Sequence, residues 1–188
     1  MSKEYFSIPN LMGYFRILMI PVFLYTYYHA ESREDYLAAF LILGVSLLTD
    51  FFDGKIARKF HMVTEFGKIL DPVADKLTQG SLAIAVLFRY PMMKLFLAVF
   101  LLKECYMSLM GLYIIRKKNI RKGAQWFGKI TTAVVDVGIM VLLLAPNLPA
   151  NIADTLIIIM IAFMLFSLVN YMRFYHGILK AAGTAEKV

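Results

Sequence analysis

Charge and cysteine are scarce in this chain of 188 residues. Only 18% of the residues are charged, and there is a single cysteine, Cys105. One cysteine excludes an internal disulfide and is compatible with a reducing compartment. Hydrophobic residues make up 60% of the chain, whereas soluble domains usually contain about 45–50%. The composition therefore indicates a membrane protein.

The N-terminus also lacks the pattern of a cleavable signal peptide. The stretch MSKEYFSIPNLMGYFRI carries charge and a proline where such a peptide would be apolar. Its first residues, around Tyr5, Phe6 and Ile8 up to Pro9, interleave charge with aromatic rings, which predicts a short interfacial helix. The net charge of +7 does not favour nucleic acid as a partner. In membrane proteins, basic residues usually collect in cytoplasmic loops and meet anionic lipid headgroups.

Long apolar stretches occur in six places, each close to the roughly 20 residues that a transmembrane helix needs. The predicted spans are about Leu11–His29, Tyr36–Phe52, Ile69–Tyr90, Met92–Ile115, Ile130–Leu144 and Ile152–Tyr171. The connections are short, and no internal repeat is apparent. The sequence thus predicts an all-α integral membrane protein, a bundle of six transmembrane helices that forms one domain over residues 1–188.

Lysine and arginine are distributed unevenly among the connections, which predicts the orientation. One side holds Lys55, Arg58, Lys59, Lys68, Arg116, Lys117, Lys118, Arg121, Lys122, Lys129, Arg173, Lys180 and Lys187. The other side holds Arg33, Arg89 and Lys94. We therefore expect both termini and the connection between the second and third spans to face the cytoplasm.

Four aspartates flank that connection, in the segment LTDFFDGKIARKFHMVTEFGKILDPVADKL. Asp50 and Asp53 are three residues apart, and Asp71 and Asp75 are four apart, so each pair lies on one helical face. Converging carboxylates repel one another and require a cation. Oxygen ligands favour Mg²⁺, Mn²⁺ or Ca²⁺, and four carboxylates suffice for two ions. Helix caps would explain two of the four, but Asp75 is expected a full turn inside a span, where ionisable residues are usually functional.

Small residues and one arginine accompany the aspartates. Gly54 follows Asp53, Ala57 and Arg58 come one turn later, and Gly67 precedes Asp71 by four positions. Glycine allows a ligand or a backbone to approach closely, and an arginine fork suits a phosphate group. Helix packing and an ordinary cytoplasmic charge explain each residue equally well when it is taken singly.

The complete pattern is D-x2-D-G-x2-A-R-x8-G-x3-D-x3-D, from Asp50 to Asp75. It resembles the signature of the CDP-alcohol phosphotransferases, integral membrane enzymes of phospholipid synthesis. The resemblance implies that Asp50, Asp53, Asp71 and Asp75 bind two Mg²⁺ or Mn²⁺ ions and that Asp75 is also the general base. It further implies that a CDP-linked lipid binds at Gly54, Ala57, Arg58 and Gly67, and that the enzyme is a homodimer. An alcohol would then attack the lipid phosphorus and release CMP.

Two stretches bear on the acceptor alcohol. SIPNLMGYFRI and DPVADKL resemble the phosphatidylglycerophosphate synthases of this family, which use CDP-diacylglycerol and sn-glycerol 3-phosphate. Such an anionic acceptor would need basic partners, for which Arg116, Lys129 and Arg173 are the candidates; an ordinary positive-inside charge explains each as well.

The chain departs from those synthases at two places, where it has Lys103–Glu104 and GKITT. A less basic pocket would fit phosphatidylglycerol as the acceptor, which makes a cardiolipin synthase of the same fold the alternative. Lys103 and Glu104 are expected to form an internal ion pair. A divalent-cation transporter is the competing class, disfavoured because the carboxylates lie at one membrane face without an inverted repeat.

Overall fold

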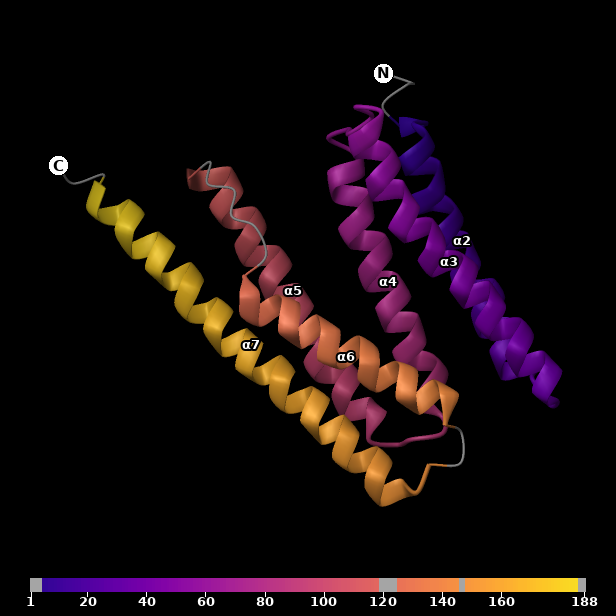
Figure 1. Cartoon of the computed structure of the whole chain (residues 1–188). Helices are drawn as coiled ribbons and strands as arrows, with labels where there is room; N and C mark the ends of the chain where they lie inside the picture. The colour runs from indigo at the N-terminus through magenta and orange to yellow at the C-terminus, as the bar shows by residue number, and fades with distance from the viewer. Residues whose placement is uncertain (1–4, 119–124, 146–147, 186–188) are drawn as a thin grey trace. The chain divides into compact units, whose positions relative to one another are not determined.

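Helices are the regular secondary structure of this protein throughout the part that its computed structural model describes, residues 5–118, 125–145 and 148–185 (Figure 1). They are α2 (Ile8–Tyr28), α3 (Arg33–Lys59), α4 (Gly67–Leu87), α5 (Met93–Lys118), α6 (Trp126–Leu144) and α7 (Ala150–Ala185). The predicted all-α class is confirmed, and each predicted span corresponds to one helix.

Five of these helices are long and apolar enough to cross a membrane: α2, α3, α5, α6 and α7. The chain is therefore a multi-pass membrane protein. The third predicted span corresponds to α4, which carries Asp71, Asp75 and Lys76 within its 21 residues. These charges lie well inside α4, and two of them, Asp71 and Asp75, belong to the aspartate motif.

Two of the predicted spans end several residues before the corresponding helices do. The second span was expected to end at Phe52 and the sixth at Tyr171, whereas α3 continues to Lys59 and α7 to Ala185. Hydropathy marks only where the chain stops being apolar, while the helical hydrogen bonds continue through polar residues. The 36-residue α7 is the longest of the six helices.

The N-terminal interfacial helix falls only partly on described residues. Tyr5 is helical, and α2 itself begins at Ile8 after the cap residue Ser7, whose hydroxyl accepts a hydrogen bond from the Asn10 amide at 3.4 Å. Residues 1–4 lie outside the described ranges, as do Arg121, Lys122 and Lys187. For Lys117 and Lys118 the structure describes the backbone alone.

The chain forms two compact units, Met1–Ala85 and Val86–Val188. In the first unit, α2 packs along α3, and buried Phe23, Ala39 and Leu43 contribute to its core. Gly13 of α2 lies against Leu70 of α4, so closely that a Cβ atom there would be 3.0 Å from Leu70 Cδ2. Close packing of these helices places the polar residues of α2 beside those of α3 and α4.

In the second unit, α7 packs against both α5 and α6. Its core contains Phe96 of α5, Ile139 of α6 and Met160 and Met164 of α7, all fully buried. A Cβ at Gly138 would clash with the Met160 side chain, so α6 approaches α7 through a residue without a side chain.

Candidate active site

The turn between α3 and α4 orients both aspartate pairs. At the end of α3, His61 adopts a left-handed conformation with φ of 53°. The amide of Met62 donates to the carbonyl of Ala57 at 2.9 Å, which is the hydrogen bond of a Schellman motif. The α4 helix then begins where the Thr64 hydroxyl accepts a hydrogen bond from the Gly67 amide at 2.9 Å. Two short caps therefore reverse the chain within a few residues.

Three of the four aspartates meet at one guanidinium, that of Arg16 in α2. Its Nη2 donates to Asp53 Oδ2 at 3.0 Å and its Nη1 to Asp75 Oδ1 at 2.5 Å. The same Nη1 also bonds Asp50 Oδ1. The expected convergence of the pairs is thus present for Asp50, Asp53 and Asp75. The cation that holds these three carboxylates in the structure is Arg16, from a different helix, and no role was predicted for it from the sequence.

The cluster has a buried floor and an open rim. The side chains of Arg16 and Asp53 are 2% and 5% exposed, whereas those of Asp50 and Asp75 are 44% and 53% exposed. Asp71 is half-buried, one turn before Asp75 on α4. A ligand that approaches the cluster would therefore meet Asp50 and Asp75 first, while Asp53 stays beneath them.

The donor set suits a hard divalent cation, because it consists of carboxylate oxygens from two adjacent helices. Asp50 Oδ1 and Asp75 Oδ1 already converge on a single point, the Nη1 atom of Arg16. Across the described ranges, however, no three histidine, cysteine, aspartate or glutamate side chains are arranged to hold a metal ion. The aspartates thus fit a metal by chemistry, and in this structure the guanidinium lies where their oxygens meet.

Gly54, directly after Asp53, and Arg58, about one turn further along α3, border open space. Among the described residues beyond its own stretch of helix backbone, a Cβ atom at Gly54 would meet the Arg58 Nη2 atom at 3.9 Å and nothing nearer. The Arg58 side chain is exposed and Ala57 is half-buried. There is room here for a ligand, beside a cationic group.

Gly67, in contrast, is tightly enclosed. A Cβ atom at this position would be 2.6 Å from Asn10 Oδ1 and 3.0 Å from Thr64 Oγ1. Asn10 is buried in α2, and its side-chain amide donates to the Thr64 hydroxyl at 3.1 Å. Gly67 therefore packs against the contact that joins the start of α2 to the start of α4.

The three basic residues proposed for the acceptor all belong to the second unit. Arg116 lies in the last turn of α5, Lys129 in the first turn of α6 and Arg173 in α7, and all three side chains are exposed. Arg173 is 23 residues beyond Ala150, which corresponds to about 35 Å along α7. Lys103 and Glu104 of α5 form the expected ion pair, with Nζ and Oε1 2.7 Å apart.

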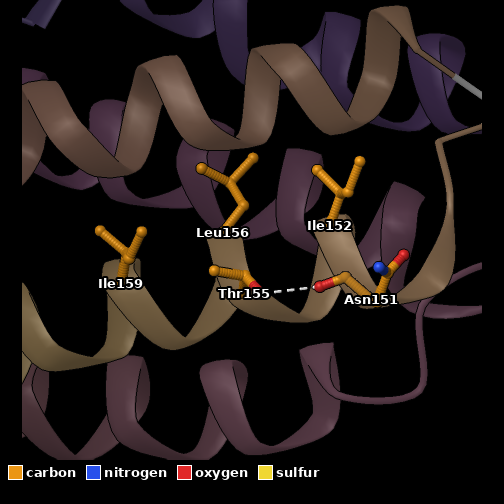
Figure 2. A pocket seen from close by; sticks show the side chains of 5 residues that line it. All are labelled: Asn151, Ile152, Thr155, Leu156 and Ile159. Atoms are coloured by element: carbon orange, nitrogen blue, oxygen red, sulfur yellow. Dashed lines mark hydrogen bonds between the residues drawn. The ribbon is translucent and has the colours of Figure 1, made fainter.

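The same unit contains a pocket along the first turns of α7 (Figure 2). It is lined by Asn151, Ile152, Thr155, Leu156 and Ile159. The Thr155 hydroxyl donates to the backbone carbonyl of Asn151 at 2.7 Å, within α7 itself. Since none of these side chains can carry charge or transfer a proton near neutral pH, the pocket lacks the chemistry of the aspartate cluster.

Comparison with known proteins identifies the family. Residues 6–169 match the family model described as CDP-alcohol phosphatidyltransferase. The chain belongs to this family. It is 31% identical over 171 residues to the CDP-diacylglycerol--glycerol-3-phosphate 3-phosphatidyltransferase of Escherichia coli K12, covering 89% of this chain and 93% of that protein. It is also 30% identical over 166 residues to the probable phosphatidylglycerophosphate synthase of Mycobacterium tuberculosis H37Rv, covering 87% and 78%.

Membership of the CDP-alcohol phosphatidyltransferase family makes the chain a transferase, and the cation-transporter alternative is set aside. The family match, over residues 6–169, includes residues of both compact units. Sequence reasoning missed Arg16, Asn10 and Thr64. The available signal for Arg16 was its position, since a lone arginine inside an otherwise apolar stretch requires a partner. Asn10 and Thr64 are ordinary polar residues in sequence, and only the fold places them together.

Proposed function

We propose that the protein transfers a phosphatidyl group from CDP-diacylglycerol to sn-glycerol 3-phosphate and releases CMP. The observation that carries the proposal is the convergence of Asp50 and Asp53 of α3 with Asp75 of α4, with a rim exposed to ligands. The two relatives bearing the names of such enzymes support the choice of donor and acceptor.

In this proposal Asp50, Asp53, Asp71 and Asp75 hold two Mg²⁺ or Mn²⁺ ions. When bound, the metal stabilises negative charge on the pyrophosphate and on the leaving CMP. Asp53 is buried at the floor of the cluster and holds the bound metal from that side. Asp50 and Asp75, at the exposed rim, face the incoming nucleotide-lipid.

Asp75 acts as the general base. Its carboxylate takes the proton of the acceptor hydroxyl as that oxygen attacks the lipid-bearing phosphorus. The bond between this phosphorus and the bridging oxygen of the pyrophosphate breaks, and CMP leaves with the electron pair. The 53% exposure of the Asp75 side chain supports this role, because the hydroxyl must reach its oxygen.

The open space beside Gly54 suits the CDP moiety, with Ala57 beside it and Arg58 on a phosphate. Gly67 contributes by allowing α4 to start close to Asn10. Arg116, Lys129 and Arg173 bind the phosphate of the acceptor. We further propose that residues 1–188 form one catalytic domain, that the active site and both termini face the cytoplasm, and that the enzyme is a homodimer.

Release of CMP from CDP-diacylglycerol by the purified protein tests the reaction class. We expect release to require both an acceptor and Mg²⁺ or Mn²⁺, and to stop in excess chelator. Chromatography of the lipid product then tests the acceptor, with sn-glycerol 3-phosphate and phosphatidylglycerol supplied separately. Phosphatidylglycerophosphate as the product supports the proposal, whereas cardiolipin from phosphatidylglycerol alone would replace it with the cardiolipin synthase reaction.

A further inference from the structure

Arg16 is an unusual residue for its position. It lies in the ninth position of α2, a helix apolar enough to span the membrane, and only 1% of the residue is exposed. A buried charge in such a helix is costly unless it is paired. Among the described residues, its ion-pair partners are all aspartates of the motif, so its charge is balanced by the candidate metal ligands themselves.

Its hydrogen bonding is also incomplete. The Nε atom of Arg16 is buried and makes no hydrogen bond to any described residue. Buried polar atoms are usually hydrogen-bonded, so an unbonded donor in a buried arginine requires an explanation. The guanidinium of Arg16 is bonded through Nη1 and Nη2 to the three carboxylates, and in the described part of the chain no other group hydrogen-bonds it.

The geometry also makes the guanidinium and a metal ion compete for the same point in the cluster. Asp50 Oδ1 and Asp75 Oδ1 both bond the same nitrogen, Nη1. A cation that used these two oxygens together would need the space that Nη1 occupies, and it would face a like charge at contact distance. A metal ion can therefore take the point between these two oxygens only if the guanidinium moves away from it.

From these contacts we infer that Arg16 is an internal counter-ion that holds the aspartates together before the metal binds and is displaced by it. Arg16 thereby sets the affinity for the metal as a positioning residue. It keeps Asp50, Asp53 and Asp75 assembled without a metal. A metal ion that binds must first break the hydrogen bonds between Arg16 and these aspartates, which lowers its affinity. This inference rests on the proposed metal-dependent function and adds that the guanidinium of Arg16 competes with the metal for the aspartates.

Arg16→Met tests the inference, because methionine preserves much of the length and removes the charge. Mn²⁺ binding to the purified variant is measured without CDP-lipid, from the electron paramagnetic resonance signal of free Mn²⁺. We expect Arg16→Met to bind Mn²⁺ about tenfold more tightly or better, since displacing charge-assisted hydrogen bonds weakens the wild type by at least that factor. Arg33→Met is the matched control, because Arg33 is exposed at the opposite end of α3, and it should bind as the wild type does.

Thermal unfolding supplies a second readout. In chelator, Arg16→Met should unfold at a lower temperature than the wild type, and saturating Mn²⁺ should reduce that difference. If Arg16→Met fails to fold in both conditions, Arg16→Lys takes its place and should bind Mn²⁺ more tightly than the wild type by a smaller factor. Equal or weaker Mn²⁺ binding in the folded variant would overturn the inference.

The two proposals fail in different ways. If the wild type binds Mn²⁺ and releases CMP but the Arg16 variant gains no affinity, the counter-ion role alone is wrong. If neither the wild type nor the variants bind Mn²⁺ and CMP is not released, the proposed function is wrong, and the inference is overturned with it.

Discussion

At the scale of single residues, the aspartates differ most in how deeply they are buried. Asp53 is 5% exposed at the side chain, and Asp50 and Asp75 are near half. A buried carboxylate that loses its partner is strongly destabilising, by roughly 3–5 kcal/mol, whereas an exposed one can be solvated. Substitutions at the rim should therefore report on chemistry, and those at the floor on stability as well.

Asp75→Asn should abolish transfer while retaining much of the affinity for CDP. The carboxamide keeps the size of the side chain and one ligand oxygen, but it cannot take the acceptor proton. We expect a rate lower by about 10²–10⁴-fold. CMP release measures turnover, and calorimetry with CDP measures binding.

Asp50→Asn is the comparison for this variant. Asp50 is assigned only a ligand role, so metal and CDP binding should weaken together with the rate. Near wild-type turnover in Asp75→Asn would require a different general base.

Gly54→Leu should block binding of CDP-diacylglycerol and leave the protein folded. In the described part of the chain, the nearest atom outside the local helix backbone is Arg58 Nη2, 3.9 Å from a Cβ at this position, so the side chain enters open space rather than the core. Gly44→Leu, in the same helix and with nothing within 4 Å, is the matched control and should bind normally. Unchanged CDP-diacylglycerol affinity in folded Gly54→Leu would show that the space is not used by the nucleotide.

At the scale of helices, the contact between Asn10, Thr64 and Gly67 connects α2 to the start of α4. Thr64 caps α4 through the Gly67 amide, and Asn10 bonds the cap. The same pairing of helices brings Arg16, less than two turns after Asn10, to the aspartates. The contact thus positions α2 so that Asn10 meets the start of α4 and Arg16 meets the aspartates.

Gly67→Ala should separate these helices. The new Cβ would lie 2.6 Å from Asn10 Oδ1 and must displace it. Overpacking of this kind costs about 1–3 kcal/mol, and the unfolding temperature in detergent should fall. Gly44→Ala is the control and should be neutral or more stable by up to about 1 kcal/mol, because alanine favours a helix. An equal unfolding temperature in both variants would contradict the assigned role of Gly67.

The helices were predictable from sequence and the contacts between them were not. Six apolar stretches predict six helices because hydropathy is local, and the spacing of Asp50 with Asp53 and of Asp71 with Asp75 predicts shared faces. The partner of these aspartates depends on which side of α2 meets α3, a property of packing. The role of Arg16 was therefore not predicted from the sequence. The ends of α3 and α7 were predicted too early, because polar residues continue both helices beyond their apolar stretches.

At the scale of the whole molecule, the acceptor site is proposed on the second unit. Lys129→Ala and Arg173→Ala should each raise the Michaelis constant for sn-glycerol 3-phosphate by about 10- to 100-fold, since a charge-assisted hydrogen bond contributes about 1.5–3 kcal/mol. The constant for CDP-diacylglycerol should change less. Lys94→Ala, an exposed lysine at the start of α5, is the control. Wild-type constants in both variants would place the acceptor elsewhere.

The orientation can be tested with cysteines in a Cys105→Ser background. Glu65→Cys, in the turn before α4, should react with a membrane-impermeant maleimide only from the cytoplasmic side. Glu31→Cys, in the turn before α3, should react only from the opposite side. The reverse pattern would invert the proposed topology, and labelling of both from one side would mean that α3 does not cross the membrane.

The length of α7 ties the enzyme to the thickness of its bilayer. Its 36 residues correspond to about 54 Å, whereas the hydrocarbon core is about 30 Å thick. The excess must be absorbed by tilt or by turns that stand in the headgroup layer. Arg173 lies about 35 Å from the start of this helix, so a thicker bilayer would draw its charge toward the acyl chains and a thinner one would release it. Through hydrophobic mismatch, an enzyme that makes phospholipid would sense the membrane that its own product builds.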